Sequence, residues 1–146
     1  MIEAGARFGP SRWLEVDQAR IDRFAEATED HQGIHVDPAA AAAGPYGTTV
    51  AHGFLTLSLL VPLLYELAPA DDGRVLVNYG VNRVRFPAAV PSGSRIRAVF
   101  EVVAVEDVPG GRQATLEATV EREGGDKPVC VAQLLLRLID PPGGST

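Results

Sequence analysis

One change of hydrophobic pattern restricts the possible folds of this chain more than any other feature. Residues 54–68 are almost entirely apolar, so a helix in this segment has no polar face to present to water and must be buried. The segments that follow are instead rich in Val, Ile, Leu and Thr: residues 74–86, 94–107, 112–123 and 127–139. Polar and apolar residues alternate within 114–121, which is typical of a sheet with one buried face. This order predicts an α+β fold in which a curved antiparallel sheet wraps around a long central helix.

Turn-forming residues separate the predicted strands. Pro91-Ser92-Gly93, Pro109-Gly110-Gly111 and Gly124-Gly125-Asp126 combine the residue types that favour tight turns. Because such turns join neighbouring antiparallel strands, we expect the consecutive strands to form short hairpins.

The first half of the chain is predicted to be helical. Asp17 is suited to cap a short helix that runs toward Thr28, and Asp37-Pro38 is typical of the start of a second helix. Gly44 would end that second helix. A turn-rich loop then leads to Ala51-His52-Gly53, where the long apolar helix is expected to begin.

Length, composition and charge favour one domain over 1–140 with a flexible C-terminal tail over 141–146. The 13 basic and 19 acidic side chains give a net charge of −6, which disfavours nucleic acid and anionic lipid as partners. The apolar segment is shorter than the roughly 20 residues that cross a membrane. Residues 1–7 lack an export signal, and the single Cys130 cannot form an internal disulfide, so we expect a cytoplasmic protein.

The three histidines of the chain lie close together in the sequence, at His31, His35 and His52, and Asp30 precedes the first of them. Asp30 and His35 are expected in a loop between two short helices, where both side chains can point into one cleft and hold a water molecule. A carboxylate and an imidazole together can accept one proton and donate another. We therefore predict that Asp30 and His35 are the catalytic residues.

Other chemistries have weaker support in the sequence. His31, His35 and Asp37 have the chemistry of metal ligands, but their spacing matches no familiar ligand motif, so we expect no metal. Ser58 lacks the G-x-S-x-G motif of a nucleophilic serine, and Cys130 lies in the middle of a predicted strand. Both are expected to be core residues.

The start of the long helix offers a second functional feature. The first N–H groups of a helix have no intrahelical acceptor, and a glycine lets a ligand oxygen approach the main chain closely. Gly53 is therefore a candidate oxyanion-binding residue, and His52 and Gln32 are candidate substrate contacts beside it. The alternative is an ordinary helix start at which the glycine only eases the turn.

Two stretches together resemble a known motif: Thr28–Pro38, which reads TEDHQGIHVDP, and Val50–Leu55, which reads VAHGFL. They resemble the hydratase motif of MaoC-like (R)-specific enoyl-CoA hydratases, and the nodulation-protein-N-like branch is the most similar. The likeness continues through Val77–Pro87 into the later strands and so covers most of the chain. The chain departs from many members of the family by having His31-Gln32-Gly33 after the aspartate.

This resemblance implies a hot-dog fold, in which a long helix is wrapped by an antiparallel sheet, and a homodimer. It implies reversible addition of water to a trans-2-enoyl-CoA, which gives the (R)-3-hydroxyacyl-CoA. Coenzyme A is then part of the substrate, and no cofactor is required. By position, Asp30 and His35 would hold the water, and the backbone N–H of Gly53 would polarise the thioester carbonyl.

A run of basic residues suggests where the carrier could bind. Residues 74–100 contain five arginines and no acid, and Arg83, Arg85 and Arg97 are candidate contacts for the phosphates of coenzyme A. The alternative is a solvated strand edge on which charge blocks aggregation.

Two other functions remain open at this point. A protein with the same fold could hydrolyse an acyl-CoA thioester, or it could bind acyl-CoA as a non-catalytic partner subunit.

Overall fold

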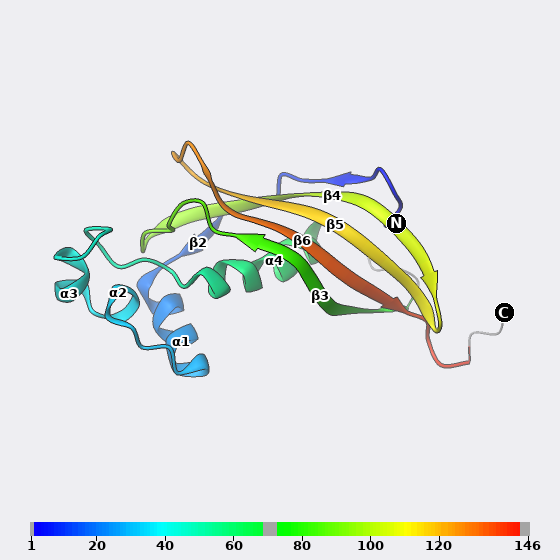
Figure 1. The fold of residues 1–146 in the computed structure, drawn as a ribbon, viewed down its shortest axis with the longest axis horizontal. Coiled ribbons are helices and arrows are strands. Elements are labelled where there is room, and N and C mark those ends of the chain that lie inside the picture. Colours follow the sequence, from blue (N-terminus) through cyan, green and yellow to red (C-terminus); the bar gives the residue numbers. More distant parts are fainter. Residues whose placement is uncertain (1, 69–72, 144–146) are drawn as a thin grey trace.

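The computed structural model describes residues 2–68 and 73–143. Short elements precede the central helix, and four long strands follow it (Figure 1). In chain order the elements are β1 (Arg7–Phe8), β2 (Leu14–Val16), α1 (Gln18–Thr28), α2 (Gly33–Val36), α3 (Pro38–Ala42), α4 (Gly53–Leu67), β3 (Val75–Arg85), β4 (Ser94–Val108), β5 (Gly111–Arg122) and β6 (Pro128–Ile139).

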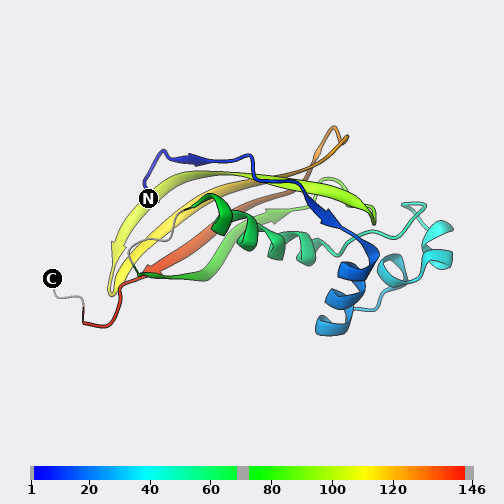
Figure 2. The ribbon, with the colours of Figure 1, turned by 180° about the vertical axis from the view of Figure 1, so that it is seen from behind.

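The six strands form one antiparallel sheet in the order β1-β4-β5-β6-β3, and β2 also pairs with β4. The sheet curves around α4, which lies along its concave face, as both views show (Figures 1 and 2). The helices α1, α2 and α3 gather beyond one end of the sheet, next to the start of α4 (Figure 1). This arrangement confirms the predicted α+β fold with a helix wrapped by a sheet.

The core lies between α4 and the concave face of the sheet. Leu60, Leu63 and Leu64 of α4 are buried against the inward-facing residues of β4, β5 and β6, among them Phe100 and Leu116. Burying one such side chain contributes about 1.5–3 kcal/mol. The helix is not buried on every side, however: Phe54 is 70% exposed and Tyr65 is 56% exposed.

One predicted connection is wrong. The chain forms hairpins between β4 and β5 and between β5 and β6, as expected, but β3 pairs with β6 at the far edge of the sheet and not with β4. Residues 86–93 therefore cross from one edge of the sheet toward the other. A pairing between strands so far apart in sequence leaves no local turn signal, and the crossing segment later forms one wall of the site.

The predicted helices of the first half are confirmed, and their caps explain them. The Asp17 side chain accepts a hydrogen bond from the N–H of Arg20 at 2.9 Å, and Asp37 accepts from Ala39 and Ala40 at 3.1 Å each. The first half is not wholly helical, because β1 and β2 pair with β4. Strands of two and three residues are too short to show a hydrophobic period.

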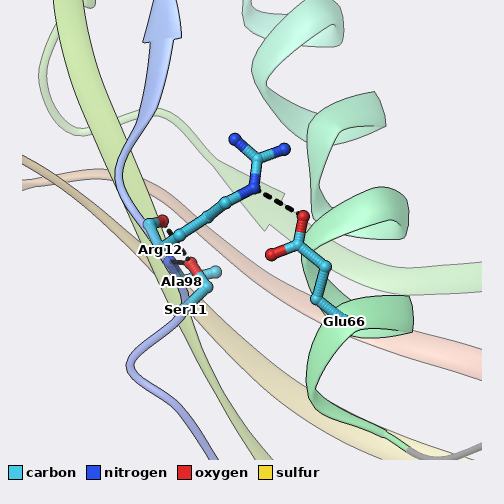
Figure 3. A network of polar contacts seen from close by, with 4 residues as sticks. All are labelled: Ser11, Arg12, Glu66 and Ala98. Carbon is cyan, nitrogen blue, oxygen red and sulfur yellow. Dashed lines mark hydrogen bonds and ion pairs between the residues drawn. The ribbon is translucent and has the colours of Figure 1, made fainter.

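Polar contacts fasten the N-terminal segment to the rest of the fold (Figure 3). Arg12 donates to Glu66 of α4 at 2.6 Å, and the hydroxyl of Ser11 accepts from the N–H of Ala98 in β4 at 2.9 Å. The segment thus joins the helix to the sheet.

Of the predicted tail over 141–146, residues 144–146 lie outside the described residues, and 141–143 follow β6. Among the residues described, no helix is both long and apolar enough to span a membrane.

Candidate active site

Asp30, His35 and His52 meet beside the start of α4. Each offers one oxygen or nitrogen atom within 4.8 Å of those of the other two. Asp30 is exposed, whereas His35 and His52 are 7% and 3% exposed. A buried imidazole and an exposed carboxylate at this separation can both contact one water molecule, because two hydrogen bonds that meet at a water span roughly 4.5–5 Å.

The structure holds the His35 ring in one orientation. His35 lies on the one-turn helix α2 and not in a loop, and its Nδ1 is 2.7 Å from the backbone oxygen of Val50. A carbonyl oxygen only accepts, so Nδ1 carries the ring hydrogen and Nε2 keeps a free lone pair. Gln18 adds a second tether, because its side-chain amide donates to the backbone oxygen of His35 at 2.8 Å.

Asp30 lies in the tight loop that ends α1. The preceding residue, Glu29, has a left-handed backbone with φ of 63°, which turns the chain back toward α2. The backbone N–H of Gln32 lies 3.4 Å from a carboxylate oxygen of Asp30. Gln32 therefore contacts Asp30 through its main chain, and its side chain is exposed.

His52 contacts both of the other two residues. Its Nε2 is 2.9 Å from the backbone oxygen of Asp30, and its ring stacks on that of His35, with centroids 3.8 Å apart and planes 23° apart. His52 is thus joined to both predicted catalytic residues and is nearly excluded from solvent.

Gly53 is the first residue of α4, and the Phe86 ring occupies the space next to its Cα. A Cβ atom at this position would lie 2.9 Å from Cε2 of Phe86, which is closer than real Cβ atoms approach other atoms. The N–H of Gly53 is one of the four at the helix start without an intrahelical acceptor. The glycine thus lets the Phe86 ring lie against the main chain beside that N–H.

Two clefts meet at these residues. One, of about 400 Å³, is lined by Phe24, Thr28, Asp30, His52 and Phe54. The other, of about 260 Å³, is lined by residues of the loop before α4 and of the crossing segment, among them Ile34, Tyr46, Val50, Ala88 and Val90. His35, Gly53 and Phe86 line both clefts. An extended molecule could therefore lie across His35 with one end in each cleft.

The geometry does not bring together the metal ligands considered from the sequence. His31 points toward Glu26 at 3.6 Å, and Asp37 caps α3. Asp30, His35 and His52 lie close enough to ligate an ion, but the two imidazoles are stacked, so their in-plane lone pairs lie in nearly parallel planes, which disfavours a shared ion. The absence of a metal stays a prediction.

The predicted arginine contacts do not lie in one patch. Arg83 and Arg85 are exposed on β3 at one edge of the sheet, and Arg97 lies on β4, three strand positions away. Arg97 also stacks over Trp13, 4.3 Å from the ring centroid, and forms an ion pair with Glu121. Its guanidinium is thus engaged within the sheet, whereas Arg83 and Arg85 stay open to solvent.

Three contributors to the site were missed from the sequence: Gln18, Val50 and Phe86. Val50 acts through its backbone oxygen, so its side chain gave no signal. Phe86 lies at the end of β3 before Pro87, where the strand pattern ends and the chain must turn, and this is the one signal that could have drawn attention to it.

Comparisons with known proteins show what this chain is similar to. The MaoC-like domain family matches residues 2–125. The 3-hydroxyacyl-thioester dehydratase Z of Mycobacterium tuberculosis is 51% identical over 93% of this chain and 91% of its own length. Nodulation protein N of Rhizobium leguminosarum bv. viciae is 45% identical over 88% of this chain and 81% of its own length.

A solved structure, described as the (R)-hydratase from A. caviae involved in PHA biosynthesis, matches with a TM-score of 0.76 at 26% identity. The match covers 93% of this chain and 96% of that one, and it confirms the predicted hot-dog fold. The chain therefore belongs to the MaoC-like domain family, with relatives among its dehydratases, its hydratases and Nodulation protein N.

Proposed function

We propose that this protein is a hydro-lyase that adds water reversibly to a trans-2-enoyl thioester and forms the (R)-3-hydroxyacyl thioester. The observation that carries the proposal is that Asp30, His35 and Gly53 line one cleft, with Nε2 of His35 left free by the bond from its Nδ1 to Val50. The names of the relatives support the reaction and its (R) outcome.

The proposed chemistry follows from the charges that develop. When water attacks C3 of the enoyl group, negative charge moves to the thioester oxygen, and the N–H of Gly53 stabilises it there. A donor already in place for such charge contributes about 3 kcal/mol. His35 Nε2 accepts one proton from the water while Asp30 holds its other hydrogen. The proton then passes to C2 on the same face, so no cofactor is needed.

The two clefts suggest how the substrate lies. His35, Gly53 and Phe86 line both clefts, so an extended thioester would lie across them with its acyl chain in one cleft and the start of its carrier in the other. Coenzyme A is the proposed carrier. Arg83 and Arg85 are exposed and are the better candidates for its phosphates, because Arg97 is engaged with Glu121 and Trp13.

We further propose a homodimer in the cytoplasm, formed by the free edge of β3 and the adjacent face of α4. Val77, Tyr79 and Val81 of β3 are between 38% and 59% exposed, and Phe54 and Tyr65 of α4 are also exposed. An exposed apolar strand at a sheet edge pairs readily with a second strand. A second copy of this chain would extend the sheet and cover these side chains.

A direct assay separates the proposed reaction from its alternatives. The purified protein is mixed with crotonyl-CoA, and loss of the enoyl absorbance is followed together with release of free thiol. Hydration without thiol release supports the proposal. Thiol release would indicate a thioesterase, and binding of crotonyl-CoA without either change would indicate a non-catalytic acyl-CoA-binding subunit.

A further inference from the structure

His52 lies at the start of α4 but does not use its side chain to cap that helix. The side chain turns instead toward α1, where Nε2 meets the backbone oxygen of Asp30 at 2.9 Å. Because this oxygen can only accept, Nε2 carries the ring hydrogen and donates it. His52 thereby fastens the start of α4 to the loop that carries Asp30.

The His52 ring also sets the position of the His35 ring. The two rings stack with centroids 3.8 Å apart, and Phe24 lies 4.8 Å from His52 at a tilt of 56°. The Val50 oxygen fixes one edge of the His35 ring, and the His52 ring covers one of its faces. Two such supports restrict rotation of the imidazole that is proposed to accept the proton.

The remaining nitrogen of His52 shows that packing alone does not explain this residue. Nδ1 is buried and has no hydrogen-bond partner among the described residues. A buried polar atom without a partner lowers stability, and a phenylalanine would fill the same space without that cost. The hydrogen bond from Nε2 to Asp30 is the contact that a phenylalanine could not make.

We infer that His52 is a positioning residue, which holds the Asp30 loop by a hydrogen bond and the His35 ring by stacking. In this role His52 acts on the reaction through Asp30 and His35, and the substrate contact predicted from the sequence stays a prediction. This inference rests on the proposed function, since it concerns the rate of that reaction.

Three variants test the two contacts separately. His52→Phe keeps an aromatic ring but loses the donor, so kcat is expected to fall by about 100-fold, the loss that misplaced reacting groups can cause. His52→Gln keeps an N–H donor near the position of Nε2. Its kcat is expected to be at least about tenfold higher than that of His52→Phe. KM should change by less than about threefold in both, because a positioning residue affects the placement of the reacting groups more than substrate binding.

His31→Gln is the matched control, because His31 lies in the same region but points to Glu26 on the surface, and its kcat should equal that of the wild type. The inference is overturned if His52→Phe keeps the wild-type kcat, if the loss appears in KM, or if His52→Gln recovers nothing over His52→Phe.

A second measurement uses the wild-type protein and does not depend on activity. Long-range ¹H–¹⁵N correlation spectra of the imidazoles should show hydrogen on Nε2 of His52 and on Nδ1 of His35. The opposite tautomer at His52 would overturn the inference. If the wild type fails to hydrate enoyl thioesters while this tautomer pattern is observed, the proposed reaction fails and the hydrogen bond to Asp30 stands.

Discussion

The ring of Phe86 lies against the main chain of Gly53, so that a Cβ atom on this glycine would be 2.9 Å from the ring. This contact joins the end of β3 to the start of α4 and places an aromatic wall between the two clefts. The glycine therefore leaves room for the ring beside the proposed site.

Replacing Gly53 with alanine tests this contact. The added methyl group must displace Phe86, and such overpacking is expected to lower the free energy of unfolding by about 1–3 kcal/mol. The backbone N–H of residue 53 remains, but the Phe86 ring beside it must move, so kcat should also fall. Urea unfolding and hydration rates measure the two effects.

The double variant Gly53→Ala with Phe86→Leu separates packing from backbone conformation. A smaller residue at position 86 makes room for the methyl group. The double variant should therefore lose less free energy of unfolding than the two single variants lose together. A Gly53→Ala protein as stable and as active as the wild type would show that the contact with Phe86 is not tight.

The positions of the arginines predict different effects at Arg85 and Arg97. Arg85→Ala should raise KM for an enoyl-CoA, and the increase should shrink at high salt, because a phosphate contact is screened. Arg97→Ala should leave KM unchanged and lower the melting temperature, because this side chain contacts Trp13 and Glu121. Equal KM values for Arg85→Ala and the wild type at low salt would remove Arg85 from the proposed binding site.

The exposed edge of β3 predicts the effect of a charge there. Wild-type protein should sediment at about twice the chain mass of 15.5 kDa, and Val81→Lys should sediment as a monomer, because lysine on an edge strand opposes pairing. Val103→Lys is the control, since Val103 is similarly exposed, at 45% against 47%, but lies on β4. A dimeric Val81→Lys protein, or a monomeric wild type, would contradict the proposed interface.

Burial of Cys130 predicts that its thiol is unreactive in the folded protein. Desolvation raises its pKa to about 11, so little thiolate is present at pH 8, where an ordinary cysteine with a pKa near 8.5 is partly ionised. A thiol reagent at pH 8 should label the folded protein slowly and the urea-unfolded protein at once. Labelling of the folded state should accelerate as the pH rises toward 11. Rapid labelling at pH 8 would show that β6 opens or that the thiol is accessible.

The parts of the fold predicted from the sequence are those with local signals. The apolar run of α4, the caps Asp17 and Asp37, and the turns before β5 and β6 each act over a few residues, and the structure confirms them. The pairing of β3 with β6 has no such signal, because the two strands are far apart in the sequence.

The same limit applies to the site. The sequence placed Asp30, His35 and Gly53 near one another because they share a motif. It could not indicate that the oxygen of Val50 orients His35, or that Phe86 reaches Gly53. The sequence also could not indicate the ion pair of Arg97, because the run of arginines contains no acid. Glu121 comes to lie directly opposite Arg97 only when β4 pairs with β5.

The central claim is that Asp30 and His35 together move the protons of an enoyl-thioester hydration. The most direct test is the rate of crotonyl-CoA hydration by the wild type, Asp30→Asn and His35→Gln, with substrate binding measured in parallel. Each variant is expected to lose at least about 100-fold in kcat, as loss of a general acid–base group does, while still binding crotonyl-CoA. Equal hydration rates for all three proteins would contradict the account.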